Sequence, residues 1–319
     1  MKHTVTVDAI RAAADRIAPW IHRTPVLTNH TLDEQTGCRL FFKCENLQKA
    51  GAFKSRGACN VVFGLEEESA RQGVVTHSSG NHAAALARAA AMRSIPAHIV
   101  MPRNAPRVKV DAVREYGGTI HFCEPTLAAR ESTADSVQKE TGAHFVHPYD
   151  DVRIITGQAT AALELCDDCP ELDVVIAPVG GGGLLAGTVL SIQALRPGCR
   201  IIGAEPEAVN DAWLSLQSGT IQPATGQPSL GDGLLTSLGL ITFPIIQAGV
   251  ERIILASEQT IRRATNLFHE RMKQVVEPSG AVPLAAMLDE PGCFAGLKVG
   301  VIISGGNVDL ADFYRSEAQ

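Results

Sequence analysis

The chain has 319 residues, of which 45% are hydrophobic and 19% are charged, and it carries a formal net charge of −6 at pH 7. This length allows two lobes with separate cores, and the acidic balance leaves no basic stripe for binding nucleic acid. Residues 1–5 lack the apolar segment of a signal peptide, so we expect a cytoplasmic protein. The eight cysteines show no disulfide spacing, which predicts free thiols.

Short β-branched runs alternate with alanine-rich helical segments along the chain. The predicted strands are residues 74–76, 97–101, 119–122, 144–146, 174–177, 200–204 and 299–303. The predicted helices of the first half are residues 81–91, 106–116 and 127–140, and residues 218–229 have the composition of an exposed loop. This alternation predicts an α/β fold of two open twisted lobes with mostly parallel sheets. The site is then expected in the cleft between the lobes.

Residues 174–192 are apolar enough to resemble a membrane span. Four consecutive glycines interrupt them, and the backbone groups of such a loop would be unsatisfied in lipid. A strand, a loop and a helix explain the segment better, so we expect no membrane association.

The glycine run from Gly180 to Gly183 follows one predicted strand and precedes an apolar helical segment. Four glycines expose backbone N–H groups at a helix start, where amide donors and the helix dipole suit a phosphate. The spacing fits neither the dinucleotide fingerprint nor the nucleoside-triphosphate loop. For the loop on its own, a purely structural tight turn is the alternative.

Three further motifs accompany the glycine run. Residues 41–58 read FFKCENLQKAGAFKSRGA, residues 76–82 read THSSGNH, and residues 303–310 read ISGGNVDL. In this order, over nearly the whole chain, the four motifs resemble those of the fold-type II pyridoxal-phosphate enzymes, in the serine racemase and serine/threonine dehydratase group. The resemblance implies a tryptophan-synthase-β-like fold and a homodimer. It also implies a large cofactor-binding domain of residues 1–72 and 149–319 and a small mobile domain of residues 73–148.

The resemblance assigns cofactor roles to individual residues. Lys54 matches the lysine that forms a Schiff base with pyridoxal 5'-phosphate, and we expect burial near cations to lower its pKa. Phe53 packs against the cofactor ring or is only a core aromatic, and Asn81 matches the residue bonded to the phenolic oxygen. The cofactor phosphate is expected on the loop formed by Gly180, Gly181, Gly182, Gly183 and Leu184.

The substrate carboxylate is expected on the turn before the helix at 81–91. The members of this turn are Ser78, Ser79, Gly80, Asn81 and His82. A helix N-cap is the structural alternative, and both roles are compatible because helix N-termini attract carboxylates. By the same resemblance, Ser79 matches the second acid/base of the racemases.

Ser304 matches the residue that meets the pyridine nitrogen of the cofactor. A carboxylate at this place would keep the nitrogen protonated and would make the ring a strong electron sink, whereas a serine hydroxyl is a neutral partner. A weaker sink favours reactions in which a β-leaving group departs soon after the Cα proton. This is the chemistry of β-elimination.

Two weaker features concern a metal and the substrate's distal end. Glu205, Val209 and Asp211 reproduce the spacing at which some relatives bind Mg²⁺ or Ca²⁺ through two carboxylates and a backbone carbonyl, and a solvated acidic loop is the alternative. Arg130 matches a racemase arginine near the distal end of the substrate, or it is an ordinary solvated helix charge. If it points into the cleft, a distal carboxylate is favoured.

Taken together, the resemblance implies a pyridoxal-phosphate ammonia-lyase acting on a small-molecule substrate, a β-hydroxy-α-amino acid that is converted to a 2-oxo acid and ammonia. The candidate substrates are serine, threonine, threo-3-hydroxyaspartate and phenylserine. An amino-acid racemase is the alternative, because racemisation adds only one requirement, the second acid/base at Ser79. A non-catalytic pyridoxal-phosphate carrier is disfavoured by the intact set of Lys54, Ser79, Asn81 and Ser304.

Overall fold

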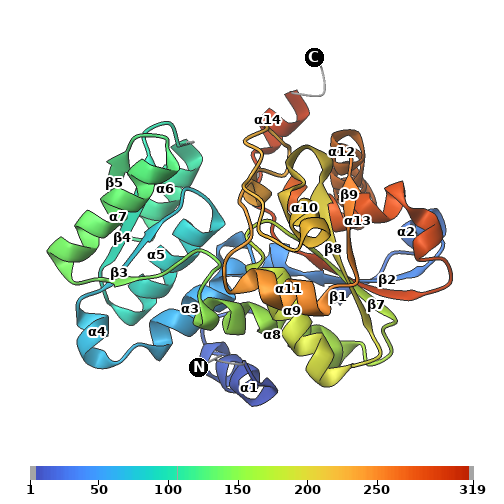
Figure 1. Cartoon of the computed structure of the whole chain (residues 1–319), viewed down its shortest axis with the longest axis horizontal. Coiled ribbons are helices and arrows are strands. Elements are labelled where there is room, and N and C mark those ends of the chain that lie inside the picture. The colour runs from blue at the N-terminus through green and yellow to red at the C-terminus, as the bar shows by residue number, and fades with distance from the viewer. Residues whose placement is uncertain (1–4, 106, 316–319) are drawn as a thin grey trace.

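The computed structural model describes residues 5–105 and 107–315, which form two lobes lying side by side (Figure 1). Residues 1–4, where no signal segment was expected, and Pro106, at the start of a predicted helix, lie outside the described residues. Each lobe is built on its own sheet, as the alternation of strand and helix patterns predicted.

The larger sheet has the strand order β1-β2-β10-β7-β8-β9. Its strands are β1 (Val26–Leu27), β2 (Arg39–Cys44), β10 (Lys298–Ile303), β7 (Val174–Pro178), β8 (Arg200–Pro206) and β9 (Arg252–Ala256). β1 pairs antiparallel with β2, and the other pairs are parallel. β7 is buried at each of its residues, because helices cover both faces of the sheet.

The smaller sheet has the order β5-β4-β3-β6 and is parallel throughout. Its strands are β5 (Thr119–Cys123), β4 (Ala97–Pro102), β3 (Val74–His77) and β6 (His144–Phe145). All four lie inside the segment expected to form the small domain. The exact domain boundaries and the mobility of this lobe stay predictions.

Helices surround both sheets and join the lobes. Those of the first half are α1 (Val7–Ile17), α2 (His30–Thr36), α3 (Lys54–Gly64), α4 (Glu67–Arg71), α5 (Asn81–Arg93), α6 (Arg107–Glu115) and α7 (Leu127–Thr141). Those of the second half are α8 (Val152–Asp168), α9 (Gly183–Leu195), α10 (Asp211–Ser218), α11 (Thr242–Gly249), α12 (Glu258–Leu267), α13 (Pro278–Asp289) and α14 (Leu310–Arg315). α3 packs on α5 of the small lobe and on α8 of the large lobe, so it links the two cores.

The predicted fold class is confirmed, and most strand boundaries agree within two residues. The exposed loop is also found, since residues 219–229 contain no helix or strand and residues 223–228 are exposed. The eight cysteines are free, as predicted. Within the described ranges, no helix is long and apolar enough to cross a bilayer. The apolar stretch 174–192 is instead β7, the glycine turn and most of α9.

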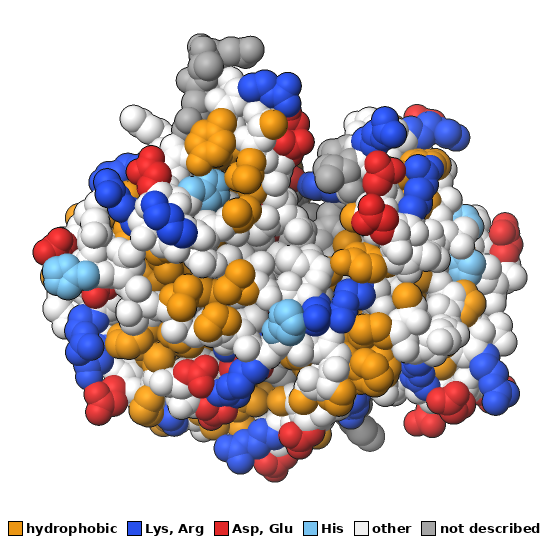
Figure 2. Space-filling model, turned by 180° about the vertical axis from the view of Figure 1, so that it is seen from behind, with side chains coloured by type: hydrophobic (Ala, Val, Ile, Leu, Met, Phe, Trp, Pro, Cys, Tyr) orange, Lys and Arg blue, Asp and Glu red, His pale blue; other side chains and the backbone are white. Residues whose placement is uncertain are grey.

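Charged side chains of both signs are mixed on one face of the surface (Figure 2). On the face seen in Figure 2, Lys and Arg side chains are interspersed with Asp and Glu side chains, and the described residues of this face form no continuous basic stripe. Hydrophobic side chains lie between them in small groups.

Candidate active site

Lys54 and Ser304 are brought together where β10 ends. The Phe53 N–H donates to the Ser304 carbonyl at 3.0 Å, and Ala52 pairs with Gly305 in an isolated antiparallel bridge. α3 begins directly afterwards, at Lys54, and Ser304 is only 3% exposed. Two motifs 250 positions apart in the sequence therefore meet because β2 and β10 are neighbours in the larger sheet.

The Lys54 side chain lies in a setting that favours a neutral amine. Its Nζ donates to the Pro148 carbonyl at 2.8 Å and lies 5.1 Å from the centroid of the Phe53 ring. Burial lowers the pKa of Lys54 to about 8, and the carboxyl group of Glu277 opposes this shift. The expected direction is correct, but the expected cause is only half right. Burial lowers this pKa, and the neighbouring charge named here is an anion that raises it.

Asn81 is the first residue of α5, and the large lobe holds its amide group. Its Nδ2 donates to Glu277 Oε1 at 2.7 Å, and its Oδ1 accepts from Asn307 Nδ2 at 2.9 Å. Burial and the nearby Asp232 raise the pKa of Glu277 to about 8, while the hydrogen bond from Asn81 lowers it. The sequence motifs did not indicate Glu277. It is 196 residues away from Asn81, and no short-range pattern marks the pair.

The start of α5 is open to an anion. Gly80 is the N-cap residue and no side chain caps the helix, although Ser78 Oγ accepts from the Gly80 N–H at 3.3 Å. The side-chain capping that was weighed as an alternative is therefore not found. Ser79 is partly buried in the same turn. Burial, and then the charge of Lys54, hold the pKa of His82 well below its ordinary value, so this side chain is neutral.

Neighbouring groups occupy the space beside each glycine of the 180–183 loop. A Cβ at Gly181 would overlap the Tyr149 ring, and a Cβ at Gly180 would lie 2.8 Å from Leu234 Cα. Gly182 has φ +88° and precedes α9, which begins without a side-chain cap. The glycines are thus required by packing and backbone geometry. The uncapped N–H groups of α9 keep the predicted capacity for a phosphate.

Leu184 and Tyr149 complete this part of the site. Leu184 lies in the first turn of α9, is 4% exposed, and packs in the core of the large lobe. Tyr149 follows Pro148, the acceptor for Lys54, and its ring packs edge-on against His147 with centroids 4.6 Å apart. Burial and the adjacent Asp150 raise the pKa of Tyr149 to about 12, so its phenol keeps its proton. The sequence did not single out Tyr149. The sequence feature that reflects Tyr149 is Gly181, because the Tyr149 ring leaves no space for a side chain at that position.

The acidic segment from the end of β8 to the start of α10 is buried at its three candidate ligands. Glu205, Val209 and Asp211 are 0%, 2% and 1% exposed. The Glu205 carboxylate accepts from the N–H groups of Ala212 and Trp213, both at 2.8 Å, whereas both carboxylate oxygens of Asp211 are buried without a partner among the described residues. Burial raises the pKa of Glu205 to about 8 and that of Asp211 to about 6. Burial rules out the solvated loop, and two adjacent buried acids fit a hard divalent cation.

Arg130 lies in α7 beside the end of β3. It is partly buried, and its Nε is buried without a partner in the described part of the chain. Its charge lowers the pKa of His77, the last residue of β3, after the larger effect of burial. Ser78 follows His77 directly, so the charge of Arg130 reaches the residue that precedes the turn at residues 78–82. A fully solvated helix charge does not describe this residue.

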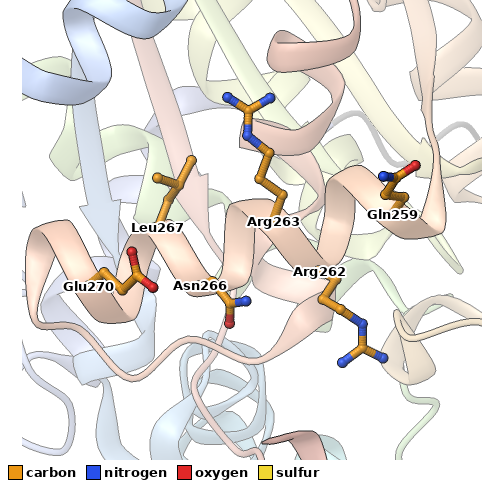
Figure 3. Close-up of a pocket in the computed structure, with 6 residues that line it drawn as sticks. All are labelled: Gln259, Arg262, Arg263, Asn266, Leu267 and Glu270. Atoms are coloured by element: carbon orange, nitrogen blue, oxygen red, sulfur yellow. The ribbon is translucent and has the colours of Figure 1, made fainter. Parts of the chain in front are cut away.

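A separate pocket of about 340 Å³ runs along α12 (Figure 3). It is lined by Gln259, Arg262, Arg263, Asn266, Leu267 and Glu270, none of which belongs to the four motifs. The Arg262 guanidinium lies 5.2 Å from the centroid of the Phe313 ring. This pocket is therefore distinct from the site around Lys54.

Comparisons with known proteins agree with this geometry. The sequence model of the family described as "Pyridoxal-phosphate dependent enzyme" matches residues 17–305. The "beta-hydroxyaspartate dehydratase" of Paracoccus denitrificans is 50% identical over 305 residues, which cover 96% of this chain and 97% of that protein. The "L-threo-3-hydroxyaspartate ammonia-lyase" of Saccharomyces cerevisiae is 42% identical, with 93% and 92% covered. The crystal structure of serine racemase from Dictyostelium discoideum has 48% identity and a TM-score of 0.92, and the match covers 96% of this chain and 100% of that one.

Proposed function

The chain belongs to the family of pyridoxal-phosphate dependent enzymes, and from this premise we propose that it is an ammonia-lyase for 3-hydroxyaspartate. The reaction converts a β-hydroxy-α-amino acid to a 2-oxo acid and ammonia. The observation that carries the reaction class is Lys54, a partly buried amine with its pKa lowered to about 8 near the uncapped start of α5. Two of the similar proteins are named as lyases of this substrate type, which supports the assignment.

The residues of the site fit pyridoxal 5'-phosphate. The uncapped start of α9 offers N–H groups for the phosphate, Asn81 keeps one amide N–H for the phenolic oxygen, and Ser304 offers a buried neutral hydroxyl for the pyridine nitrogen. Phe53 is partly buried beside Lys54 and offers an apolar wall. When bound, the cofactor supplies an electron sink for negative charge at the substrate's Cα.

The chain's own groups then bind the substrate and move its protons. The α-carboxylate is held by N–H groups at the start of α5, in the turn that contains Ser78 and Ser79. Lys54 takes the Cα proton, because an amine with a pKa of about 8 is partly neutral at neutral pH. Water is lost with the β-hydroxyl and is consumed again when the nitrogen leaves as ammonia. The 2-oxo acid and ammonia therefore account for every atom of the substrate.

Arg130 supports the choice of a dicarboxylic substrate. Its Nε is buried, and its charge reaches the residue that precedes the turn that receives the α-carboxylate. A second carboxylate on the substrate would provide the acceptor for a two-pronged hydrogen bond. Serine, threonine and phenylserine offer no such acceptor.

We also propose a divalent cation, Mg²⁺ or Ca²⁺, at Glu205, the Val209 carbonyl and Asp211. The support is the unpartnered Asp211 carboxylate next to a second buried acid. These oxygen donors suit a hard cation. The cation would be structural, since it would neutralise two buried like charges at the base of α10.

Racemisation remains the second candidate, because serine racemases are also similar to this chain. It would need a proton donor on the face opposite Lys54, and Ser79 is the candidate. A Ser79→Ala variant should suppress formation of the D-isomer far more than formation of the 2-oxo acid. A D-isomer yield above the 2-oxo-acid yield on all four candidate substrates would establish the racemase.

We further propose that the enzyme is a homodimer in the cytoplasm. The support for a dimer is a pair of exposed apolar residues, Leu47 and Val275, with side chains that are 42% and 47% exposed. They are linked by Asn46, which donates to the Val275 carbonyl at 3.1 Å. Light scattering on the purified holoenzyme tests this, and a monomeric mass at micromolar concentration would contradict it.

The function is tested by measuring 2-oxo-acid release from serine, threonine, phenylserine and threo- and erythro-3-hydroxyaspartate, with and without EDTA. We expect the highest kcat/KM on a 3-hydroxyaspartate and a lower rate after chelation. Equal rates on serine and on the hydroxyaspartates would contradict the substrate assignment. No 2-oxo acid from any substrate would contradict the reaction class.

A further inference from the structure

Glu277 is a buried carboxyl group between the lobes that forms no ion pair within the described part of the chain. It precedes α13, is 5% exposed, and its N–H donates to the Gly305 carbonyl at 3.1 Å. A Cβ on Gly305 would overlap Glu277 Oε1, so the carboxyl packs directly on the backbone beside Ser304. It also lies near enough to Lys54 to affect that amine. The carboxyl is therefore held in the cofactor region from the large-lobe side.

The carboxyl belongs to a chain of hydrogen bonds that fixes the orientation of the Asn81 amide. Asn307 Nδ2 donates to the Ala50 carbonyl at 2.8 Å, and a carbonyl can only accept. The same Nδ2 donates to Asn81 Oδ1 at 2.9 Å, which leaves Asn81 Nδ2 facing Glu277 Oε1 at 2.7 Å. Each amide thus has one orientation that satisfies the whole chain.

This network of hydrogen bonds leaves one N–H of the Asn81 amide without a partner among the described residues. An amide nitrogen carries two hydrogens, and Glu277 takes one of them. The second is the donor required by a phenolic oxygen at this place. Without Glu277, the amide of Asn81 would lose the acceptor that sets its angle, and α5 would lose a contact with the large lobe.

We propose that Glu277 is a positioning residue that orients the Asn81 amide toward the cofactor and docks the start of α5 on the large lobe. This inference rests on the cofactor site of the proposed function. It goes beyond that function because Glu277 acts through Asn81. A buried carboxyl without a counterion is costly, and its retention next to a site is consistent with such a task.

The experiment measures the dissociation constant of pyridoxal 5'-phosphate from the full-length protein by absorbance titration. Glu277→Leu should raise it about tenfold, the size expected for one lost buried hydrogen bond. Glu277→Gln should restore most of the affinity, because its Oε1 can still accept from Asn81. Glu290→Leu is the matched control at the other end of α13, where Glu290 contacts Arg252 and not the small lobe. It should leave the affinity unchanged.

A double-mutant cycle tests whether Glu277 acts through Asn81. In an Asn81→Ala background, Glu277→Leu should cause no further loss, since the group it positions is gone. If Glu277→Leu does not fold, Asn307→Ala tests the same network of hydrogen bonds. In the Asn81→Ala background it should also cause no further loss of affinity. Additive losses, or equal losses in the Leu and Gln variants, would overturn the inference.

The titration uses no substrate, so its outcome is separate from the dehydration reaction. A wild-type protein that does not bind pyridoxal 5'-phosphate would overturn the proposed function itself. A wild-type protein that binds it, with unchanged affinity in Glu277→Leu, would overturn only the role of Glu277.

Discussion

Within the described residues, charged groups are paired around Arg56 and unpaired at Lys54, Arg130 and Asp211. The Arg56 guanidinium is 0% exposed and donates twice to Glu45, both at 2.7 Å. It also donates to Glu164 at 2.7 and 2.9 Å, and the buried Lys43 donates to Glu164 at 2.6 Å. Each charge of this cluster has an opposite charge within hydrogen-bonding distance.

Outside this cluster, three wholly or partly buried charges of the described chain have no such partners. In the described ranges, Lys54, Asp211 and Arg130 form no salt bridge. The hydrogen bond of Lys54 goes to a neutral carbonyl, and both oxygens of Asp211 and the Nε of Arg130 are unpartnered. An unpaired buried charge costs free energy that a paired one recovers in part. Paired charges therefore serve the scaffold here, and we propose that the unpaired charges mark where a ligand completes the site.

The largest expected effect follows from removing the unpaired amine. Lys54→Ala should lower turnover by about 10²-fold to 10⁴-fold, because it removes the base and the group that binds the cofactor covalently. Steady-state formation of 2-oxo acid from 3-hydroxyaspartate measures this. Thermal stability of the apoprotein should change little, since Lys54 is not part of the paired cluster. More than a few per cent of wild-type turnover would remove Lys54 from the mechanism.

A change in the paired cluster should instead lower the stability of the fold. Arg56→Met keeps the length of the side chain but leaves Glu45 without a counterion and Glu164 with Lys43 alone, so we expect a loss of about 3–5 kcal/mol in the free energy of unfolding. Denaturant unfolding of the apoprotein measures it. Arg23→Met is the matched control, since the Arg23–Asp168 pair has side chains 55% and 31% exposed and should contribute less than about 1 kcal/mol.

The cluster also predicts how stability depends on pH. Burial raises the pKa of Glu164 and the bonds from Arg56 and Lys43 lower it, and the bonds prevail, so it lies below its ordinary 4.5. A lowered carboxyl pKa stabilises the fold above the ordinary value, and this stabilisation is lost as the pH falls through the lowered one. The acid limb of the stability curve should therefore be steeper in wild type than in Arg56→Met. Parallel curves would show that Glu164 titrates independently of Arg56.

The sequence could predict local features of the fold and the site, but not the contacts that form only on folding. The strand at 174–177 and the four motifs could be predicted because periodicity and short spacing are local properties. The acceptor of Asn81 could not, since Glu277 is brought to it only by folding of the large lobe. Tyr149 could not be predicted for the same reason, because its contact with Gly181 joins the segment between β6 and α8 to the loop after β7.

The short edge strand β1 and the scaffold cluster show a second limit. Val26–Leu27 is too short to give an alternating pattern, and its pairing with Lys43 and Phe42 is set by the sheet edge. In the sequence, Arg56 is visible only as part of the motif at residues 41–58 that contains Lys54. Its two carboxylate partners lie in different elements, and nothing in the spacing of a motif reports how many counterions a buried arginine has.

A divalent cation bound by Glu205 and Asp211 should stabilise the native fold. Mg²⁺ at about 100 times its dissociation constant should stabilise the native state by about 2.7 kcal/mol, and EDTA should remove this. Asp211→Asn should abolish the response, because the unpartnered carboxylate is a proposed ligand. Glu207→Gln, an exposed acid of the same loop, should keep it. An equal EDTA response in both variants would place the cation elsewhere.

Arg130 should affect one class of substrate. Arg130→Met should raise KM for 3-hydroxyaspartate by about tenfold, because a charge-assisted hydrogen bond to the distal carboxylate is lost, and should leave KM for serine nearly unchanged. Parallel KM measurements on both substrates test this. Equal increases for both would mean that Arg130 acts on the α-carboxylate or on the turn at Ser78.

The smallest effect is expected from an exposed pair that bridges the lobes. Lys109 Nζ of α6 lies 2.6 Å from Asp232 Oδ2, with side chains 30% and 53% exposed, so the pair should contribute about 0.2–1 kcal/mol. Lys109→Met should therefore change kcat/KM less than about fivefold, and high salt should remove the difference. Activity at low and high ionic strength measures this. Solvent already stabilises these two charges, whereas Asn81 and Glu277 meet in the buried region between the lobes. A larger, salt-insensitive loss would mean that the exposed pair holds the lobes together, and that exposure is a poor guide to which charges matter.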